Sequence, residues 1–306
     1  MRSIAVAWLV ALSAWCLSAD AVPKAAWQDV SVVGLNKERP RAVFVPMASR
    51  EDALTRRLDA SPFYQSLNGP WRFHWAPTPA ARPQTFYRDD ANLADWPTID
   101  VPGNVEFQGY GRPVYLDEAY PFPPAPPHVP DDDNPVSSYR RTFTIDDAWR
   151  GRQVFLHFAG VSSAFYVWVN GKWVGYSEDS RTPAEFDITS FLREGENHVS
   201  VEVYRYSDGV YLECQDMWRL SGIFREVYLY AVPKTYVRDI DVRGSLDASF
   251  RDGIFDSTIE LARAADGPAD VAVEVDLVDS SGASVLARPL RAPVRVDASG
   301  DSWVRQ

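Results

Sequence analysis

The chain has 306 residues, of which 46% are hydrophobic and 24% are charged, and its formal net charge is −11. This composition is typical of a globular protein with one or two domains. The acidic balance and the lack of any Lys/Arg-rich run argue against a nucleic-acid partner. The aromatic content of 13%, with 11 Trp, suits either a large core or a surface of flat aromatic faces on which the C–H faces of sugar rings pack.

The N-terminus predicts an export signal. Arg2 is followed by the apolar run 4–17 and by an A-x-A motif at residues 19–21, the pattern of a cleavable secretory leader. The apolar run is too short to span a bilayer, so we expect no membrane partner. Loss of residues 1–21 predicts a periplasmic or secreted protein whose single remaining cysteine, Cys214, has no partner for an internal disulfide. The alternative is a buried N-terminal helix.

Beyond the leader, the sequence predicts an all-β fold. Short segments alternate between apolar and polar residues or are rich in β-branched and aromatic residues, and helical periodicity is almost absent. Asn170-Gly171 predicts a two-residue hairpin, because both central residues of a type I′ turn need positive φ. Many antiparallel strands without intervening helices favour a sandwich or jelly roll. The predicted strands are residues 154–161, 164–169, 172–177 and 198–206.

Two segments depart from this strand pattern. Residues Pro121–Pro135 are rich in proline, which cannot donate to a sheet, and predict an extended surface loop. The three successive acids within it, residues 131–133, are more typical of a solvated loop than of a metal site. Residues 186–195 offer a helix of one or two turns that ends at a glycine.

The composition changes near Pro233. Residues 235–306 show alternating strands with few aromatics, the pattern of an immunoglobulin-type sandwich. Such a sandwich takes about 100 residues. We therefore expect an incomplete immunoglobulin-like domain over residues 235–306, preceded by a jelly-roll domain over residues 22–232.

Long motifs along residues 30–232 carry a family resemblance. They include "SLNGPWRFHW" (66–75), "VPGNVEFQGYGRPVY" (101–115) and "YSDGVYLECQDMWRLSGIFREVYL" (206–229). Together they resemble the N-terminal part of bacterial β-galactosidases of glycoside hydrolase family two. The resemblance implies a sugar-binding jelly roll, an immunoglobulin-like domain and a TIM-barrel catalytic domain, of which only the first and part of the second lie in this chain.

The resemblance implies an exported enzyme that hydrolyses terminal non-reducing β-D-galactose residues in β-D-galactosides. A retaining glycosidase needs two carboxyl groups about 5–5.5 Å apart across the scissile bond. In this family both are Glu residues on the barrel, so no catalytic residue is expected in this chain, which we expect to be inactive alone. The implied partners are the β-galactoside and the enzyme's own barrel, and a homo-oligomer is compatible with the sequence. The four His residues are expected to be structural.

Three acids are implied as site residues. Asp216 of "QDMW" matches a residue that contacts the sugar and a sodium ion (Na⁺). Asp117 of "YLDEAYP" stands where Asn is usual, which keeps an acceptor oxygen but removes the amide donor. Asp208 of "SDG" matches a position linked to a peripheral magnesium ion (Mg²⁺) in some members, although it also suits a turn-closing residue. Two further departures from the family pattern are Val105 for Trp and Cys214 for Asp.

Residues 207–230 are expected to form a strand, a loop and a strand. We expect the aromatics Tyr211, Trp218 and Phe224 to pack inward or against the barrel, and the acids to point into a cleft shared with it. The pattern from Trp218 to Arg225 recurs across the family and is expected to be structural. For Asp216 the alternative is an ion pair with Arg219 that braces the turn.

Two other functions remain open on the sequence. A sister β-glucuronidase or β-mannosidase would share the Trp218-to-Arg225 pattern but commonly lacks the "SDG…QD" run. A non-catalytic carbohydrate-binding module belongs to a different functional class and would be expected to end after a complete domain.

Overall fold

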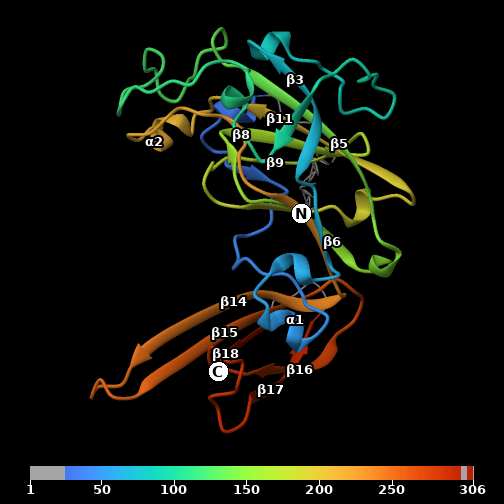
Figure 1. Cartoon of the computed structure of the whole chain (residues 1–306), viewed down its shortest axis with the longest axis vertical. Coiled ribbons are helices and arrows are strands. Elements are labelled where there is room, and N and C mark those ends of the chain that lie inside the picture. Colours follow the sequence, from blue (N-terminus) through green and yellow to red (C-terminus); the bar gives the residue numbers. More distant parts are fainter. Residues whose placement is uncertain (1–24, 298–301, 306) are drawn as a thin grey trace, which may run out of the picture.

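The structure, a computed structural model, describes residues 25–297 and the backbone of residues 302–305 (Figure 1). It is mostly β, as the sequence predicts, with two short α-helices in the described part of the chain. The predicted leader, residues 1–21, lies outside the described residues. Among the residues that the structure covers, no helix is long and apolar enough to cross a membrane.

Two antiparallel sheets make up the first part of the chain. The larger sheet has seven strands in the order β1-β9-β8-β11-β5-β3-β4, and the smaller has four in the order β10-β6-β13-β2. The larger consists of β1 (Gly34–Leu35), β9 (Lys172–Ser177), β8 (Ala164–Val169), β11 (Glu196–Tyr204), β5 (Val136–Thr144), β3 (Gly69–Ala76) and β4 (Thr98–Val101). The smaller consists of β10 (Ala184–Asp187), β6 (Gln153–Phe158), β13 (Val227–Val232) and β2 (Tyr64–Ser66).

Short elements connect these sheets. A two-stranded ladder pairs β7 (Val161–Ser162) with β12 (Gly222–Ile223). The α-helices are α1 (Arg50–Leu54) and α2 (Val210–Glu213). The 3-10 helices are η1 (Ala26–Gln28), η2 (Leu58–Ala60), η3 (Pro79–Ala81), η4 (Val105–Gln108), η5 (Asp147–Trp149) and η6 (Thr189–Phe191).

Strand β8 is buried on both of its faces. Successive side chains of a strand point to opposite sides, so Phe165 and Val167 join the core between the sheets. Tyr166 and Trp168 face the other way, into a second core under the loops and the N-terminal segment. Aromatics therefore fill two cores, and Trp27, Trp71, Trp149 and Trp168 are all buried. The high Trp content is mainly structural.

The Asn170-Gly171 hairpin is confirmed. Both residues have positive φ, 50° and 77°, and the flanking residues Val169 and Lys172 pair across the ladder from β8 to β9. Asn170 also donates from Nδ2 to the carbonyl of Phe191 at 2.9 Å, which ties the turn to the neighbouring loop.

The proline-rich segment is a loop without a strand, as predicted, and Phe122 and Val129 anchor it in the second core. No group of three or more His, Cys, Asp or Glu residues suited to a metal ion occurs in the part of the chain that the structure describes. The predicted helix over residues 186–195 is largely wrong. Strand β10 extends to Asp187, whose carboxylate accepts from both the amide and the hydroxyl of Thr189, so only the 3-10 turn η6 follows.

The second part of the chain begins at β14, directly after Pro233. It has a three-stranded sheet in the order β14-β15-β18 and a two-stranded sheet of β16 and β17. The small core between them is centred on Ile259, Leu261 and Val296. The immunoglobulin-like assignment stays a prediction. The strands are β14 (Thr235–Leu246), β15 (Gly253–Arg263), β16 (Ala269–Val275), β17 (Leu290–Val296) and β18 (Ser302–Arg305).

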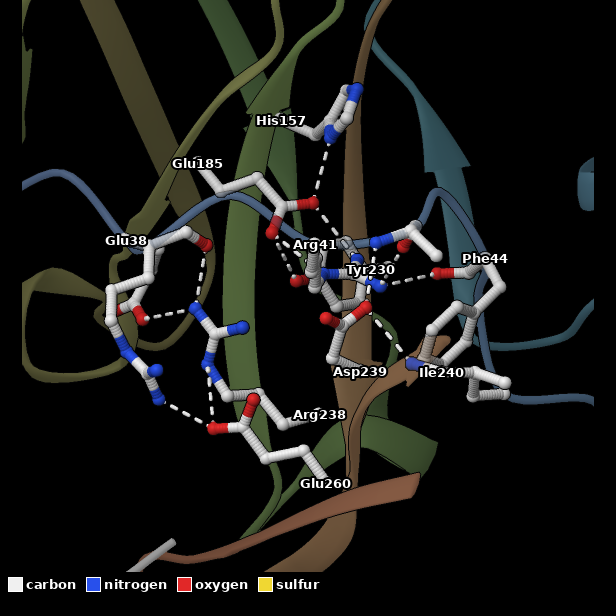
Figure 2. A network of polar contacts seen from close by, with 12 residues as sticks. Glu38, Arg41, Phe44, His157, Glu185, Tyr230, Arg238, Asp239, Ile240 and Glu260 are labelled. Atoms are coloured by element: carbon white, nitrogen blue, oxygen red, sulfur yellow. Dashed lines mark hydrogen bonds and ion pairs between the residues drawn. The ribbon is translucent and has the colours of Figure 1, made fainter. Parts of the chain in front are cut away.

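A buried carboxylate, Glu185 of β10, lies where the two parts of the chain meet (Figure 2). Its two oxygens accept from Nε and Nη2 of Arg41, both at 2.8 Å. Nδ1 of His157 lies 2.8 Å from one oxygen, and the Tyr230 hydroxyl donates to the other at 3.1 Å. Burial alone would raise the pKa of Glu185, but hydrogen bonds from His157 and Arg41 outweigh it and lower the pKa to about 2.

A second cluster continues this network into β14 and β15 (Figure 2). Arg238 donates to the Arg39 carbonyl at 2.6 Å, and Arg39 pairs with Glu260 at 2.5 Å. Next to the network is a cavity of about 420 Å³. It is lined mainly by apolar side chains together with Arg41, Glu185 and Arg238, and by none of the predicted site residues.

We expect the Glu185→Gln variant to be less stable by about 3 kcal/mol near neutral pH, because breaking a buried ion pair leaves an uncompensated charge on Arg41. Because the pKa of Glu185 is depressed in the folded state, its carboxylate stabilises the fold at pH values above the ordinary pKa of 4.5. This stabilisation is lost as the pH falls towards about 2. Denaturant unfolding across this pH range should therefore show a flatter profile for the variant.

Asp59→Asn is the matched control, because Asp59 pairs with Arg57 on the surface, where the two side chains are 56% and 70% exposed. Exposed pairs contribute about 1 kcal/mol or less. Parallel stability profiles for Glu185→Gln and the unmodified chain between pH 5 and 2 would contradict the assignment.

Candidate functional site

The predicted site residues lie on two loops at one end of the larger sheet. Residues 205–221 follow β11, and residues 112–120 cross beside them. The expected strand at the start of residues 207–230 is wrong. Backbone hydrogen bonds from Val210 to Ser207 and from Leu212 to Gly209 turn the chain into α2, and Val210 anchors that helix in the second core.

Asp216 lies on the surface within the loop after α2. One of its carboxylate oxygens accepts a hydrogen bond from the hydroxyl of Tyr115. This bond raises the pKa of the exposed Tyr115 phenol. The ring of Tyr115 packs on Trp218, with centroids 5.6 Å apart. We call Tyr115, Asp216 and Trp218 the aromatic shelf.

Trp218 does not pack inward, because 54% of its surface is exposed. Of the other two aromatics, Tyr211 packs on Tyr120 and Phe122, within the second core. Phe224 is half-buried, and the guanidinium groups of Arg181 and Arg225 lie over its ring, 4.9 and 5.4 Å from its centroid. We expect packing inward or against the barrel: Tyr211 packs inward, and for the exposed Trp218 contact with the barrel stays a prediction.

The acids of this stretch lie in different surroundings. Glu213 accepts from the amide and the hydroxyl of Ser180, at 2.7 and 2.6 Å. Glu226 is exposed, and Asp208 is buried elsewhere. Asp208 and Glu213 therefore do not point into an open cleft, and for the exposed Asp216 a cleft shared with the barrel stays a prediction.

Arg219 is buried, and the structure places its guanidinium on backbone carbonyls. Its Nη1 donates to the carbonyls of Gln215 and Met217, both at 2.5 Å, and its Nη2 donates to the carbonyl of Asp117 at 2.6 Å. The alternative that Asp216 forms an ion pair with Arg219 is therefore not supported within the described residues.

Asp117 lies on the neighbouring loop with a left-handed backbone, φ 54°. Asn and Asp adopt this conformation more readily than most residues, so the replacement of the usual Asn keeps the turn. Its side chain is exposed, while its carbonyl accepts from Arg219. Arg219 thus joins the Asp117 loop and the Asp216 loop by donating to main-chain carbonyls of both.

Asp208 is buried beside Glu178, a residue that the sequence analysis did not single out. The Tyr176 hydroxyl donates to Glu178. Burial raises the pKa of both acids, that of Glu178 to about 8. Oδ2 of Asp208 is buried without a hydrogen-bond partner. Two adjacent buried carboxyl groups disfavour each other's charge, so a shared proton or a bound cation would stabilise the pair.

The carboxyl groups of Asp208 and Glu178 fit Mg²⁺ chemically, since Mg²⁺ prefers carboxylate oxygens. Asp208 also takes part in the turn, as the alternative reading held, because its carbonyl accepts from the Tyr211 amide at 3.3 Å. At Asp216 the described residues offer one carboxylate and one phenol, so a sodium ion there would need further oxygen ligands.

Gly222, directly after the loop of residues 205–221, is closely packed. Its φ is 106°, and a Cβ there would lie 2.9 Å from the Tyr139 hydroxyl and 3.2 Å from the Gly103 carbonyl, so only glycine fits. Next to it the buried Glu106 accepts from the amide and the hydroxyl of Ser221, at 3.0 and 2.7 Å. The structural role expected for Gly222 is confirmed.

The buried histidines have structural partners. His157 packs on the Tyr228 ring at 4.3 Å and on Glu185, and His198 lies 2.6 Å from Asp89. Neither belongs to the aromatic shelf. Their expected structural role agrees with these contacts.

A family model described as the sugar-binding domain of glycosyl hydrolases family 2 matches residues 64–233. The β-galactosidase of Priestia megaterium is 44% identical over 267 residues, which cover 86% of this chain and 26% of that protein. The β-galactosidase of Halalkalibacterium halodurans is 43% identical over 268 residues, with the same two coverages.

Solved structures agree in fold. The β-glucuronidase of Bacteroides uniformis superposes with a TM-score of 0.64 at 18% identity, over 79% of this chain and 27% of that one. A putative β-galactosidase from Bacteroides fragilis superposes with a TM-score of 0.56 at 18% identity, over 79% of this chain and 34% of that one. At such identities the likeness shows the fold alone.

The family match spans more than half of the chain, and it includes the sheets and loops described above. The chain spans 26% of the length of the curated relatives named here. It therefore belongs to glycoside hydrolase family 2 and contains the sugar-binding domain of that family.

Proposed function

We propose that this chain is the N-terminal portion of an exported β-galactosidase that hydrolyses terminal non-reducing β-D-galactose residues. In this proposal, the portion forms the edge of the galactose pocket and supports a catalytic barrel in the rest of the enzyme. The observation that carries the proposal is the aromatic shelf, where the exposed Asp216 carboxylate accepts from the Tyr115 hydroxyl and the Tyr115 ring packs on the exposed Trp218.

The aromatic shelf has the chemistry that a sugar edge requires. A carboxylate makes charge-assisted hydrogen bonds to hydroxyl groups, which are stronger than bonds between neutral groups. Tyr115 and Trp218, which are 49% and 54% exposed, offer apolar ring faces beside it. Their polar tips suit a surface that is partly wet. The chain would bind and orient the sugar here, while hydrolysis would depend on the two barrel carboxyl groups of a retaining enzyme.

A β-glucuronidase is the second candidate, because proteins of that name share the fold. Its substrate carries a carboxylate, and like charges close together repel each other. The two exposed acids here, Asp216 and Asp117, lie on adjoining loops and would disfavour such a sugar. The relatives at 43–44% identity are named β-galactosidases. Both points favour a neutral galactoside.

Two cations belong to the proposal. Na⁺ would bind Asp216 together with oxygen ligands from outside the described residues. Mg²⁺ would bind the buried pair of Asp208 and Glu178, where it would replace the shared proton and hold the start of α2 against β9.

In the proposed function, the enzyme is exported and residues 1–21 are removed. The support is the sequence pattern of Arg2, the apolar run and the A-x-A motif. Expressed with this leader in a Gram-negative host, the protein should appear in the periplasm with an N-terminus at or near Val22. N-terminal sequencing checks this, and Met1 retained on soluble cytoplasmic protein would contradict export.

Asp216→Asn should reduce kcat/KM for a β-galactoside about tenfold or more in the full-length enzyme that carries this region, since each decade corresponds to about 1.4 kcal/mol. The variant keeps shape and removes charge, so galactoside binding and the response to sodium should weaken together. The melting temperature should stay unchanged, because the side chain is exposed and forms no buried ion pair.

Asp100→Asn provides the control, as a change of an exposed acid on β4, outside the shelf. Hydrolysis of a matched β-glucuronide should be measured alongside. A lower melting temperature with an intact sodium response would show that Asp216 only braces the loop. A glucuronide preferred over the galactoside would replace the proposed function with the second candidate.

Mg²⁺ should raise the melting temperature of the 306-residue chain, and Asp208→Asn or Glu178→Gln should abolish that rise. A ligand that binds only the folded state stabilises it by about 2.7 kcal/mol at a hundred times its Kd. Asp132→Asn, in the exposed acidic loop, is the control. Loss of the magnesium effect in Asp132→Asn alone would show that the magnesium site is in that loop instead.

A further inference from the structure

One buried guanidinium joins the two loops that carry the proposed site acids. Arg219 is 7% exposed. Its Nη1 donates to the carbonyls of Gln215 and Met217, the residues on either side of Asp216. Its Nη2 donates to the carbonyls of Asp117 and Ala119, at 2.6 and 3.3 Å.

The main chain of Arg219 adds to this junction. Its amide donates to the Val114 carbonyl at 2.7 Å, next to Tyr115 of the aromatic shelf. Its carbonyl accepts from Nη2 of Arg205 at 2.9 Å, and the same nitrogen donates to the Arg112 carbonyl. Each residue of the proposed sugar edge is thus either hydrogen-bonded to Arg219 or next in sequence to a residue that is. Trp218 directly precedes Arg219 in the chain.

The planar shape of the guanidinium matters here. Its donors have a fixed fork geometry, so acceptors on both sides are held at set positions. A lysine ammonium has a similar charge but cannot reach two loops with a rigid fork. The acceptors of Arg219 are carbonyls, and its buried Nε has no hydrogen-bond partner. An unsatisfied buried donor disfavours folding, so the arrangement is better suited to fixing loop positions than to maximising stability.

We propose that Arg219 is a positioning residue that holds the Asp117 loop and the Asp216 loop in a single geometry for sugar binding. This inference rests on the proposed function. Small displacements of binding groups strongly reduce catalysis, since a 1 Å misplacement can cost about a hundredfold in rate. Arg219 itself touches no substrate in this proposal and acts through the backbone on both sides.

The first test measures loop order in the 306-residue chain. Arg219→Met keeps the apolar stem and removes the fork, and Arg219→Lys keeps the charge alone. Amide hydrogen exchange should become faster in residues 112–120 and 212–218 together. Arg140→Met is the matched control, because Arg140 also donates to two carbonyls, those of Phe86 and Arg88, far from the shelf in sequence. It should leave exchange in both loops unchanged.

The second test measures catalysis in the full-length enzyme that carries this region. Arg219→Lys should lower kcat/KM for a β-galactoside about tenfold or more and raise the sodium concentration for half-maximal activity. Because the two residues act together, the double variant Arg219→Lys/Asp216→Asn should lose less than the sum of the single losses. Arg140→Met should retain both properties.

The outcomes separate the inference from the proposed function. If Asp216→Asn changes galactoside and sodium behaviour while Arg219→Lys changes neither, the inference fails and the proposed function stands. If Asp216→Asn has no effect, the proposed function fails, and faster exchange in both loops would still show that Arg219 joins them. Faster exchange in one loop only, or a lower melting temperature with an unchanged sodium response, overturns the positioning role.

Discussion

Burial of β8 on both faces is the constraint on which the rest of the structure depends. A strand covered on one side needs only a partner sheet, but Tyr166 and Trp168 on the second side also need a cover. The N-terminal segment around Trp27 and the loops around Phe86 and Phe122 supply it. These covering loops are long and irregular. The loop that carries Asp216 is anchored in the same core through Val210. The position of the aromatic shelf is thus a consequence of how the sheet is covered.

Irregular loops over a core must satisfy their backbone carbonyls without a sheet ladder. In this protein buried arginines do so. Arg219 and Arg205 donate to carbonyls of residues 112–119 and 215–219, and Glu106 accepts from Ser221 beneath them. Arginine suits this task because it presents several donors and stays charged at every relevant pH. The charge is tolerated in a buried place because the surrounding acceptors are numerous.

The junction between the two parts of the chain uses a different solution. Glu185 is buried with Arg41, which donates to both carboxylate oxygens, and with His157 and Tyr230, which each contact one of them. Such a cluster has a directional geometry that an apolar contact lacks, so it fixes how the segment around Arg41 meets β10 and β13. The cavity beside it lies away from the aromatic shelf. The aromatic shelf and the structural junction are therefore separate in this chain.

The sequence by itself determined the all-β class, the Asn170-Gly171 turn and the loop at Pro121–Pro135, because alternation, positive φ and missing amides are local properties. Motifs also determined the positions of Asp117, Asp208 and Asp216 as candidates. Only the tertiary structure decided their surroundings. Glu178, directly after β9, lies beside Asp208, and Arg219 reaches the carbonyl of a residue 102 positions away. Such long-range contacts to the backbone leave no periodic pattern in the sequence, so folding alone brings them together.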